Sequence, residues 1–99
     1  MNVLRSFKKK RLIALDYYQQ GFVYFICAQY WKLPSGIRVK LDRIARDVGG
    51  FDEAALRKLL FDVSSSVRSV SMEYNLSEWS LNVLRDKFYR RAYKELTNK

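Results

Sequence analysis

Histidine is absent from the 99 residues, and the chain has one cysteine, one proline and four glycines. Without histidine or a second cysteine, the ordinary ligand sets of a zinc site cannot be assembled. An internal disulfide is also excluded, so a reducing compartment, the cytoplasm, is the simplest expectation. Cys27 lies inside an apolar run and is expected to be a small core residue. We expect no metal and no other cofactor.

Catalysis has little support in this composition. Acid–base catalysis usually relies on histidine or on a carboxyl group tuned by its environment, and the acidic residues here are spread along polar helix faces. The pair Gly49-Gly50 lacks the surrounding pattern of a phosphate-binding loop, and no serine lies in a nucleophile motif. We therefore expect that the protein is not an enzyme.

Acidic residues are few relative to basic ones, since 10 Asp and Glu stand against 19 Lys and Arg, a net charge of +9 at pH 7. An excess of this size indicates a polyanionic partner, which can be nucleic acid, an acidic protein or an anionic membrane surface. Solubility alone would require a net charge of only about 2–8. The charge therefore favours a binding function.

The most apolar stretch, residues 22–31, contains no charge and a single polar side chain, Gln29. Such a run can be a buried helix, a buried strand or half of a membrane span. Asp16 and the glutamines disfavour a span over residues 12–31, since each charged group costs about 2.5–3.5 kcal/mol near the bilayer centre. Apolar residues recur at three- to four-residue intervals over residues 4–26, which favours a helix.

We expect residues 22–31 to form the central helix of the core. Pro34 should end it, because proline lacks a donor and biases the preceding residue away from the helical conformation. Gly21 marks either a close helix crossing or a break between two helices. The aromatic pair Tyr30-Trp31 should anchor the short helix that follows.

Local signals divide the rest of the chain. Residues 37–40 alternate apolar and basic side chains and suggest an extended piece, whereas residues 41–48 have the spacing of a short helix that ends at Gly49-Gly50. Asp52 is a good N-cap for the next helix, and Asn75 or Ser77 should begin the last one. The last helix should bury a stripe made of Leu81, Leu84, Phe88, Ala92 and Leu96. We predict an all-α fold, a single domain over residues 1–99 with four to five helices in a small bundle.

An apolar seam with alternating spacings of four and three runs over residues 56–74 and resembles a coiled-coil stripe. Serines are poor residues in helix interiors, so residues 67–74 form either the continuation of this helix, which we favour, or a strand. The seam could pair with a second copy, giving a homodimer, or with a partner helix. Packing against residues 22–31 is the alternative that we favour.

Residues 41–63 have the pattern of a helix-turn-helix-like hairpin. Ala45 would allow the two helices to approach closely, and Gly49 would take the positive φ of the turn. The second helix would then enter a major groove of DNA. An ordinary helical hairpin in a small bundle is the equal alternative.

Arg57 and Lys58 are the cations of the second hairpin helix that could contact a groove. Asp52 and Glu53 weaken this prediction, because their carboxylates stand at the start of the helix, where base contacts are normally made. Groove contacts would therefore come one turn later than usual.

Two basic blocks on expected solvent faces offer phosphate contacts that are independent of base sequence. The first block lies near the N-terminus and the second on the last helix, where no acid occurs inside it. The blocks consist of Lys8, Lys9, Lys10 and Arg11, and of Lys87, Arg90, Arg91 and Lys94. We expect a small nucleic-acid-binding or regulatory protein, with DNA preferred over RNA. The alternative is an adaptor or inhibitor that docks its basic face on an acidic protein, and a membrane partner is disfavoured.

The chain also resembles the N-terminal helix-turn-helix-like region of phage replication-organiser proteins of the YdaU type. The resemblance rests on residues in a fixed order over residues 12–63: Gly21, Tyr30-Trp31, Pro34, Leu41, Ile44-Ala45 and Gly49. The chain departs from the family pattern at Val23, where the family has tyrosine, and at residues 37–40, where the family has acidic residues. The resemblance implies a domain from a phage or other mobile element that acts near DNA, and it implies no catalytic residues.

Overall fold

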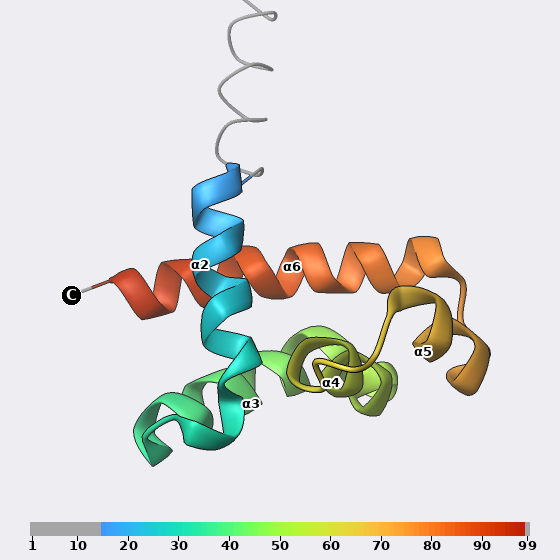
Figure 1. Cartoon of the computed structure of the whole chain (residues 1–99), viewed down its shortest axis with the longest axis horizontal. Helices are drawn as coiled ribbons and strands as arrows, with labels where there is room; N and C mark the ends of the chain where they lie inside the picture. The colour runs from blue at the N-terminus through green and yellow to red at the C-terminus, as the bar shows by residue number, and fades with distance from the viewer. Residues whose placement is uncertain (1–14, 99) are drawn as a thin grey trace, which may run out of the picture.

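The computed structural model describes residues 15–98, in which five α-helices and two short 3-10 turns occur and no strand (Figure 1). The elements are α2 (Tyr17–Ala28), η1 (Tyr30–Lys32), α3 (Ser35–Gly49), η2 (Gly50–Asp52), α4 (Glu53–Phe61), α5 (Val67–Tyr74) and α6 (Glu78–Thr97). The predicted all-α small bundle is confirmed. The helical spacing expected over residues 4–14 lies outside the described residues.

The helix α2 begins at a reciprocal cap. The Asp16 carboxylate accepts from the Gln19 backbone N–H at 2.8 Å, and the Gln19 side chain accepts from the Asp16 N–H at 3.0 Å, which satisfies two donors at the helix start. Gly21 lies within α2, so the helix is not broken there. In residues 15–98, no helix has both the length and the apolar character that a membrane crossing would require.

Pro34 begins a helix instead of ending one. The apolar helix stops earlier, at Ala28, and η1 and Leu33 separate it from α3. The Pro34 carbonyl accepts from the N–H groups of Ile37 and Arg38 at 3.1 Å each, and its φ of −57° already suits a helix start. The prediction of an extended piece at residues 37–40 is therefore wrong, because these residues form the first turns of α3.

The hairpin between α3 and α4 uses its two glycines differently. Gly50 has a φ of +55° and takes the left-handed position that was predicted for Gly49. Gly49 is buried, and a Cβ there would lie 3.3 Å from the Glu53 Cβ, so this glycine allows the close approach of α3 and α4. Asp52 precedes α4 as predicted, but its side chain makes no capping hydrogen bond.

The seam predicted as one helix over residues 56–74 is divided into α4 and α5. The Asp62 carboxylate accepts from the N–H and the hydroxyl of Ser64 at 3.0 and 2.6 Å, which turns the chain. Ser66 then begins α5 by accepting from the Ser69 N–H at 3.0 Å. Because α5 is a helix, the strand alternative for residues 67–74 is wrong. The buried seam residues pack inside the fold (Leu56, Leu60 and Val70).

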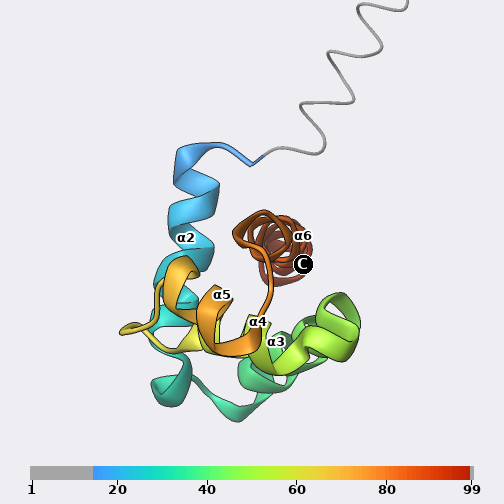
Figure 2. The ribbon, with the colours of Figure 1, turned by 90° about the vertical axis from the view of Figure 1, so that its right-hand side faces the viewer.

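The core lies between α4 and α6 and is not centred on the apolar run. Each of these two helices contacts all four of the other described α-helices, whereas α2 buries only Val23 and Cys27. Figure 2, which looks along α6, shows α2, α4 and α3 arranged around one side of that helix. Ser77 caps α6 as predicted, accepting from the Ser80 N–H at 3.0 Å. The predicted stripe of α6 faces the core, with Leu81, Phe88 and Ala92 fully buried and Leu84 and Leu96 partly buried.

Candidate nucleic-acid interface

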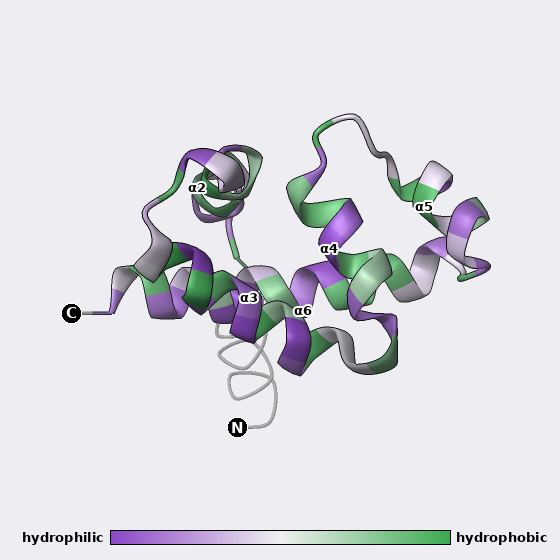
Figure 3. Ribbon diagram, turned by 90° about the horizontal axis from the view of Figure 1, so that it is seen from below, coloured by the Kyte–Doolittle hydropathy of each residue, from purple (hydrophilic) through white to green (hydrophobic). Residues whose placement is uncertain are grey.

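The helices α3 and α6 make the most extensive contact between elements of the fold, and together they carry a large share of the positive charge. Figure 3 shows both helices with hydrophilic residues along their length. We define the α3–α6 basic face by seven cations: Lys40, Arg43 and Arg46 of α3, and Lys87, Arg90, Arg91 and Lys94 of α6. All of them are exposed except Arg90, which is partly buried.

Two ion pairs join the helices across this face. Arg43 donates to Glu95 at 3.0 Å, and the Arg91 guanidinium lies 3.5 Å from the Asp47 carboxylate. Each partner is about a third to a half exposed, so each pair is worth at most about 1 kcal/mol. These pairs hold the two helices in register and, within residues 15–98, leave most of the positive charge of the face uncompensated.

The prediction that no acid lies inside the α6 block holds along α6 but fails in three dimensions. Asp47 of α3 lines a shallow groove of about 380 Å³ together with Val48, Lys87, Arg90 and Arg91. The carboxylate comes from a neighbouring helix, so spacing along α6 could not reveal it. Among the described residues, no ion pair engages Lys87, Arg90 or Lys94. The other predicted block, Lys8 to Arg11, lies outside the described residues.

Sequence reasoning missed the contribution of α3 to this face. Lys40, Arg43 and Arg46 are spaced three residues apart in one helix, but the extended conformation expected for residues 37–40 separated Lys40 from the other two. The available signal was the apolar spacing of Ile37, Leu41 and Ile44, which continues the helical pattern of α3 toward Pro34.

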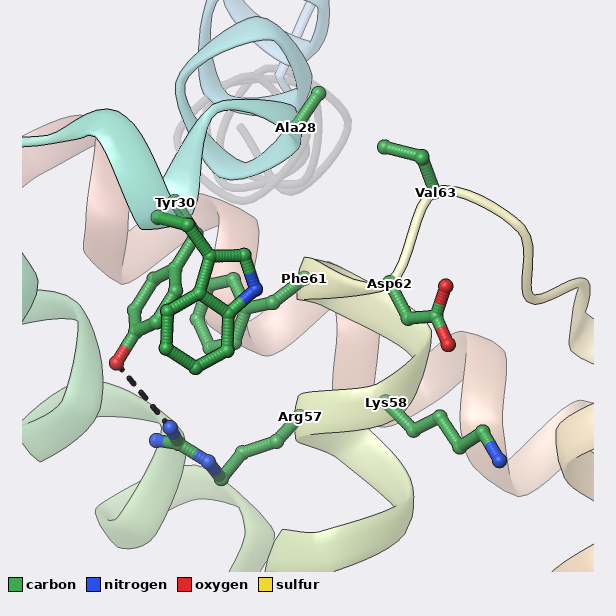
Figure 4. A pocket seen from close by; sticks show the side chains of 8 residues that line it. Ala28, Tyr30, Arg57, Lys58, Phe61, Asp62 and Val63 are labelled. Carbon is green, nitrogen blue, oxygen red and sulfur yellow. Dashed lines mark hydrogen bonds between the residues drawn. The ribbon is translucent and has the colours of Figure 1, made fainter.

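Arg57 lies in a cluster that joins η1, α3 and α4. One guanidinium nitrogen donates to Asp42 at 2.8 Å. Another donates to the Tyr30 hydroxyl at 3.2 Å, the hydrogen bond drawn in Figure 4. The Tyr30 hydroxyl itself donates to Asp42, and the guanidinium lies 5.4 Å from the centre of the Phe61 ring, within the range of a cation–π contact. A groove contact by Arg57 would have to displace these partners.

The ionisation of Asp42 reflects this cluster. Partial burial acts to raise the pKa of the carboxyl, but hydrogen bonds from Tyr30 and Arg57 and the positive charge of Arg57 outweigh it and hold the pKa below its ordinary value. For Arg57, desolvation is likewise outweighed by the hydrogen bonds to Asp42 and Tyr30, which raise its pKa. Both groups are therefore charged at neutral pH.

Lys58 lies beside Arg57 and pairs with Glu73 of α5 at 2.7 Å. The two cations line a pocket of about 430 Å³ with Tyr30, Trp31 and Phe61. Trp31 is 76% exposed and packs edge-on against Tyr30, so it anchors little of α3. Since acids of the fold engage both Arg57 and Lys58, these residues contribute less free positive charge than the α3–α6 basic face.

The hairpin predicted over residues 41–63 is present, but α4 is poorly placed for a DNA groove. Among its nine residues only Ala54 is classed as exposed, because the other helices surround it. A recognition helix must offer several side chains to base edges. The arrangement of α3 and α4 therefore fits the alternative of an ordinary helical hairpin in a bundle.

The described residues include no cluster of three or more histidine, cysteine, aspartate or glutamate side chains that could hold a metal. Cys27 is 1% exposed, and burial raises its pKa to about 12. The thiol is thus protonated at neutral pH and acts as the packing residue that the sequence predicts.

The α3–α6 basic face is the strongest candidate interface in residues 15–98. Comparison of the chain with protein-family models, with curated proteins and with solved structures finds no match. The resemblance to the YdaU type therefore stays an expectation, and the candidate interface is defined by its geometry alone.

Proposed function

We propose that the protein binds nucleic acid, with DNA preferred over RNA, through phosphate contacts made by the α3–α6 basic face. The observation that carries the proposal is the gathering of seven cations on two adjacent helices, against the carboxylates of Asp47 and Glu95. Cations at such a surface replace the counterions condensed on the phosphates, which favours binding at low salt. The block from Lys8 to Arg11 would add further contacts.

The spacing on α6 suits a duplex backbone. Lys87 and Lys94 are seven residues apart, or about 10 Å along a helix, which spans about three base steps at about 3.4 Å each. The second helix of the hairpin, α4, exposes too few side chains to read base edges, so we expect the binding to depend weakly on base sequence. A cytoplasmic regulatory role near DNA, in a phage or other mobile element, is the setting that the resemblance suggests.

A salt series with a labelled duplex tests the proposal. Fluorescence anisotropy should show binding that weakens steeply as salt rises, with a matched single strand and an RNA duplex bound more weakly. Absence of binding at about 50 mM salt would reject the proposal, because phosphate contacts are strongest there.

Charge reversal locates the binding surface. Lys87→Glu and Lys94→Glu should each weaken duplex binding severalfold and reduce the slope of log affinity against log salt by about 0.9 for each phosphate that the variant no longer neutralises. Arg68→Glu is the matched control, since it changes the net charge by the same amount at an exposed position of α5. The helix α5 lies near the start of α6, far from the C-terminal end that carries Lys94 (Figure 1). Equal effects in all three variants would mean that only net charge matters.

A protein partner is the second candidate function. Asp47 and Glu95 interrupt the basic face, and a surface of mixed charge suits an acidic protein with a complementary pattern. If Arg90→Glu and Arg91→Glu abolish binding to one protein partner but leave duplex binding unchanged, the adaptor or inhibitor role is favoured.

A further inference from the structure

The helix α2 presents an aromatic face to solvent. Tyr17 and Tyr18 are about nine-tenths exposed, and Tyr24 and Phe25 are about 60% exposed. No charged residue occurs between Tyr17 and Trp31. Within residues 15–98 these four rings are left open, although soluble monomers rarely expose large contiguous apolar patches.

The aromatic residues are placed symmetrically about Gly21. Tyr17 and Tyr18 lie four and three residues before it, and Tyr24 and Phe25 lie three and four residues after it. Since residues three and four apart share a helix face, the rings flank Gly21 in two pairs. A Cβ on Gly21 would meet no described atom within 4 Å, so the described fold does not require a glycine here.

We infer that two copies of this chain form a homodimer in which their α2 helices cross antiparallel at Gly21. A two-fold interface brings the same surface of both copies together. The symmetric order of α2 allows Tyr17 and Tyr18 of each copy to pack against Tyr24 and Phe25 of the other. Glycine at the crossing point allows the two backbones to approach closely. The seam over residues 56–74, for which pairing with a second copy was the less favoured alternative, packs its buried residues Leu56, Leu60 and Val70 inside the fold.

The available area is that of a stable interface. At roughly 150–250 Å² for each aromatic side chain, the exposed parts of the four rings and of Phe22, which is 40% exposed, amount to roughly 500–850 Å². A standard interface takes about 800 Å² from each partner. Interface cores are enriched in Tyr, Phe and Trp and depleted in charged residues, as this face is.

Charge selects a second copy as the occupant. Two chains of net charge +9 repel each other wherever their basic faces meet. The exposed face of α2 carries no charge of its own. Arg85 and Asp86 of α6, which line a groove with Gly21, carry opposite charges, so two copies can approach here with less repulsion than at their basic faces. Dimerisation there leaves the α3–α6 basic face of each copy free, so this inference does not depend on the proposed function.

Sedimentation equilibrium of the full chain, free of nucleic acid, tests the inference. The mass should approach twice 11.8 kDa as the concentration rises toward about 100 µM, since interfaces of this size can be as weak as micromolar. Gly21→Leu and Phe25→Glu should each weaken the dimer at least about tenfold. The leucine side chain would keep the two helices apart at their crossing point, and the glutamate would bury a charge in the interface. Raising salt should strengthen the dimer, the opposite of its effect on duplex binding.

Matched controls separate the interface from effects on folding. Gly36→Leu also replaces a helical glycine whose Cβ would meet nothing within 4 Å, and Met72→Glu adds a charge at a side chain that is 75% exposed on α5. Both should dimerise as the wild type does, and circular dichroism should show unchanged helix content in all four variants.

Three outcomes would overturn the inference. The first is a wild-type chain that stays monomeric at every concentration, and the second is a dimer that survives both Gly21→Leu and Phe25→Glu. The third is a monomer that binds vesicles of anionic lipid and loses that binding in Phe25→Glu, which would assign the face to a lipid surface.

Discussion

The Arg57 side chain connects three elements at the residue scale. Its guanidinium contacts Asp42 of α3, the Tyr30 hydroxyl of η1 and the Phe61 ring of α4. Tyr30 is 4% exposed and stacks on Phe61 with ring centres 4.2 Å apart. Because the hydroxyl, the carboxylate and the guanidinium satisfy one another, removing any one leaves a partly buried polar group without a partner.

Tyr30→Phe should therefore destabilise the protein by about 1–2 kcal/mol, because Asp42 loses a donor and Arg57 loses an acceptor while ring packing is kept. Urea unfolding followed by circular dichroism measures the change. Tyr74→Phe is the control, since Tyr74 is exposed on α5, away from the cluster and from the aromatic face of α2, and should change stability by less than about 0.5 kcal/mol. Similar values for the two variants would contradict the role of the cluster.

Local side-chain chemistry sets the helix ends at the element scale. Asp16, Ser66 and Ser77 each accept a hydrogen bond from a backbone N–H in the first turn of the helix that they precede. The turn between α3 and α4 instead depends on backbone conformation. Gly50, with φ +55° and ψ −123°, occupies a region that is unfavourable for a residue with a side chain.

Gly50→Ala should cost about 1–3 kcal/mol, because a residue with a side chain rarely adopts a φ of +55° together with a ψ of −123°. Gly36→Ala should be neutral or stabilising by up to about 1 kcal/mol, because it lies in α3 with open space around the added carbon. Thermal melts of the two variants and the wild type would show the difference. Equal melting temperatures for Gly50→Ala and Gly36→Ala would be inconsistent with this account.

The net charge of +9 acts on the whole molecule. Four ion pairs bridge different elements among the described residues, and each joins partly exposed groups, so their attraction is modest. The cations gathered on α3 and α6 repel one another, and this repulsion opposes the compact state.

Added salt should therefore stabilise the fold. Raising ionic strength from about 0.01 to 0.15 M shortens the screening length from about 30 to 8 Å, which weakens repulsion across the basic face more than the close ion pairs. The melting temperature of the wild type should rise as the sodium chloride concentration is raised, and that of Lys87→Glu should rise less. A melting temperature that falls with salt would indicate that ion pairing dominates.

Much of the fold follows from short-range sequence signals. The spacing of Leu81, Phe88 and Ala92 predicts the buried face of α6, and Ser77 predicts its start, since both depend on residues within a few turns. The glycine pair predicts the end of α3. These signals do not reveal that Asp62 and Ser64 form a turn that divides the seam over residues 56–74, because a polar pair of this kind is also compatible with an exposed helix surface.

The candidate site was only partly predictable. Lys87, Arg90, Arg91 and Lys94 follow from helix periodicity, but the acid that faces them, Asp47, comes from another helix. The contribution of α3 was hidden by the proline, which can either end a helix or begin one. Whether a proline ends one helix or begins the next depends on whether the residues after it can bury an apolar face as a helix.

The all-α class, the cap at Ser77 and the positive charge follow from the sequence alone, because these depend on residue type and on spacing within one helix. Only the tertiary structure decided which apolar surface becomes the core. The most apolar segment, residues 22–31, lies at one side of the fold, while the short helix α4 is enclosed by the others. Burial depends on which surfaces meet, and hydrophobicity alone does not distinguish a face that packs inside one chain from a face kept for a second copy.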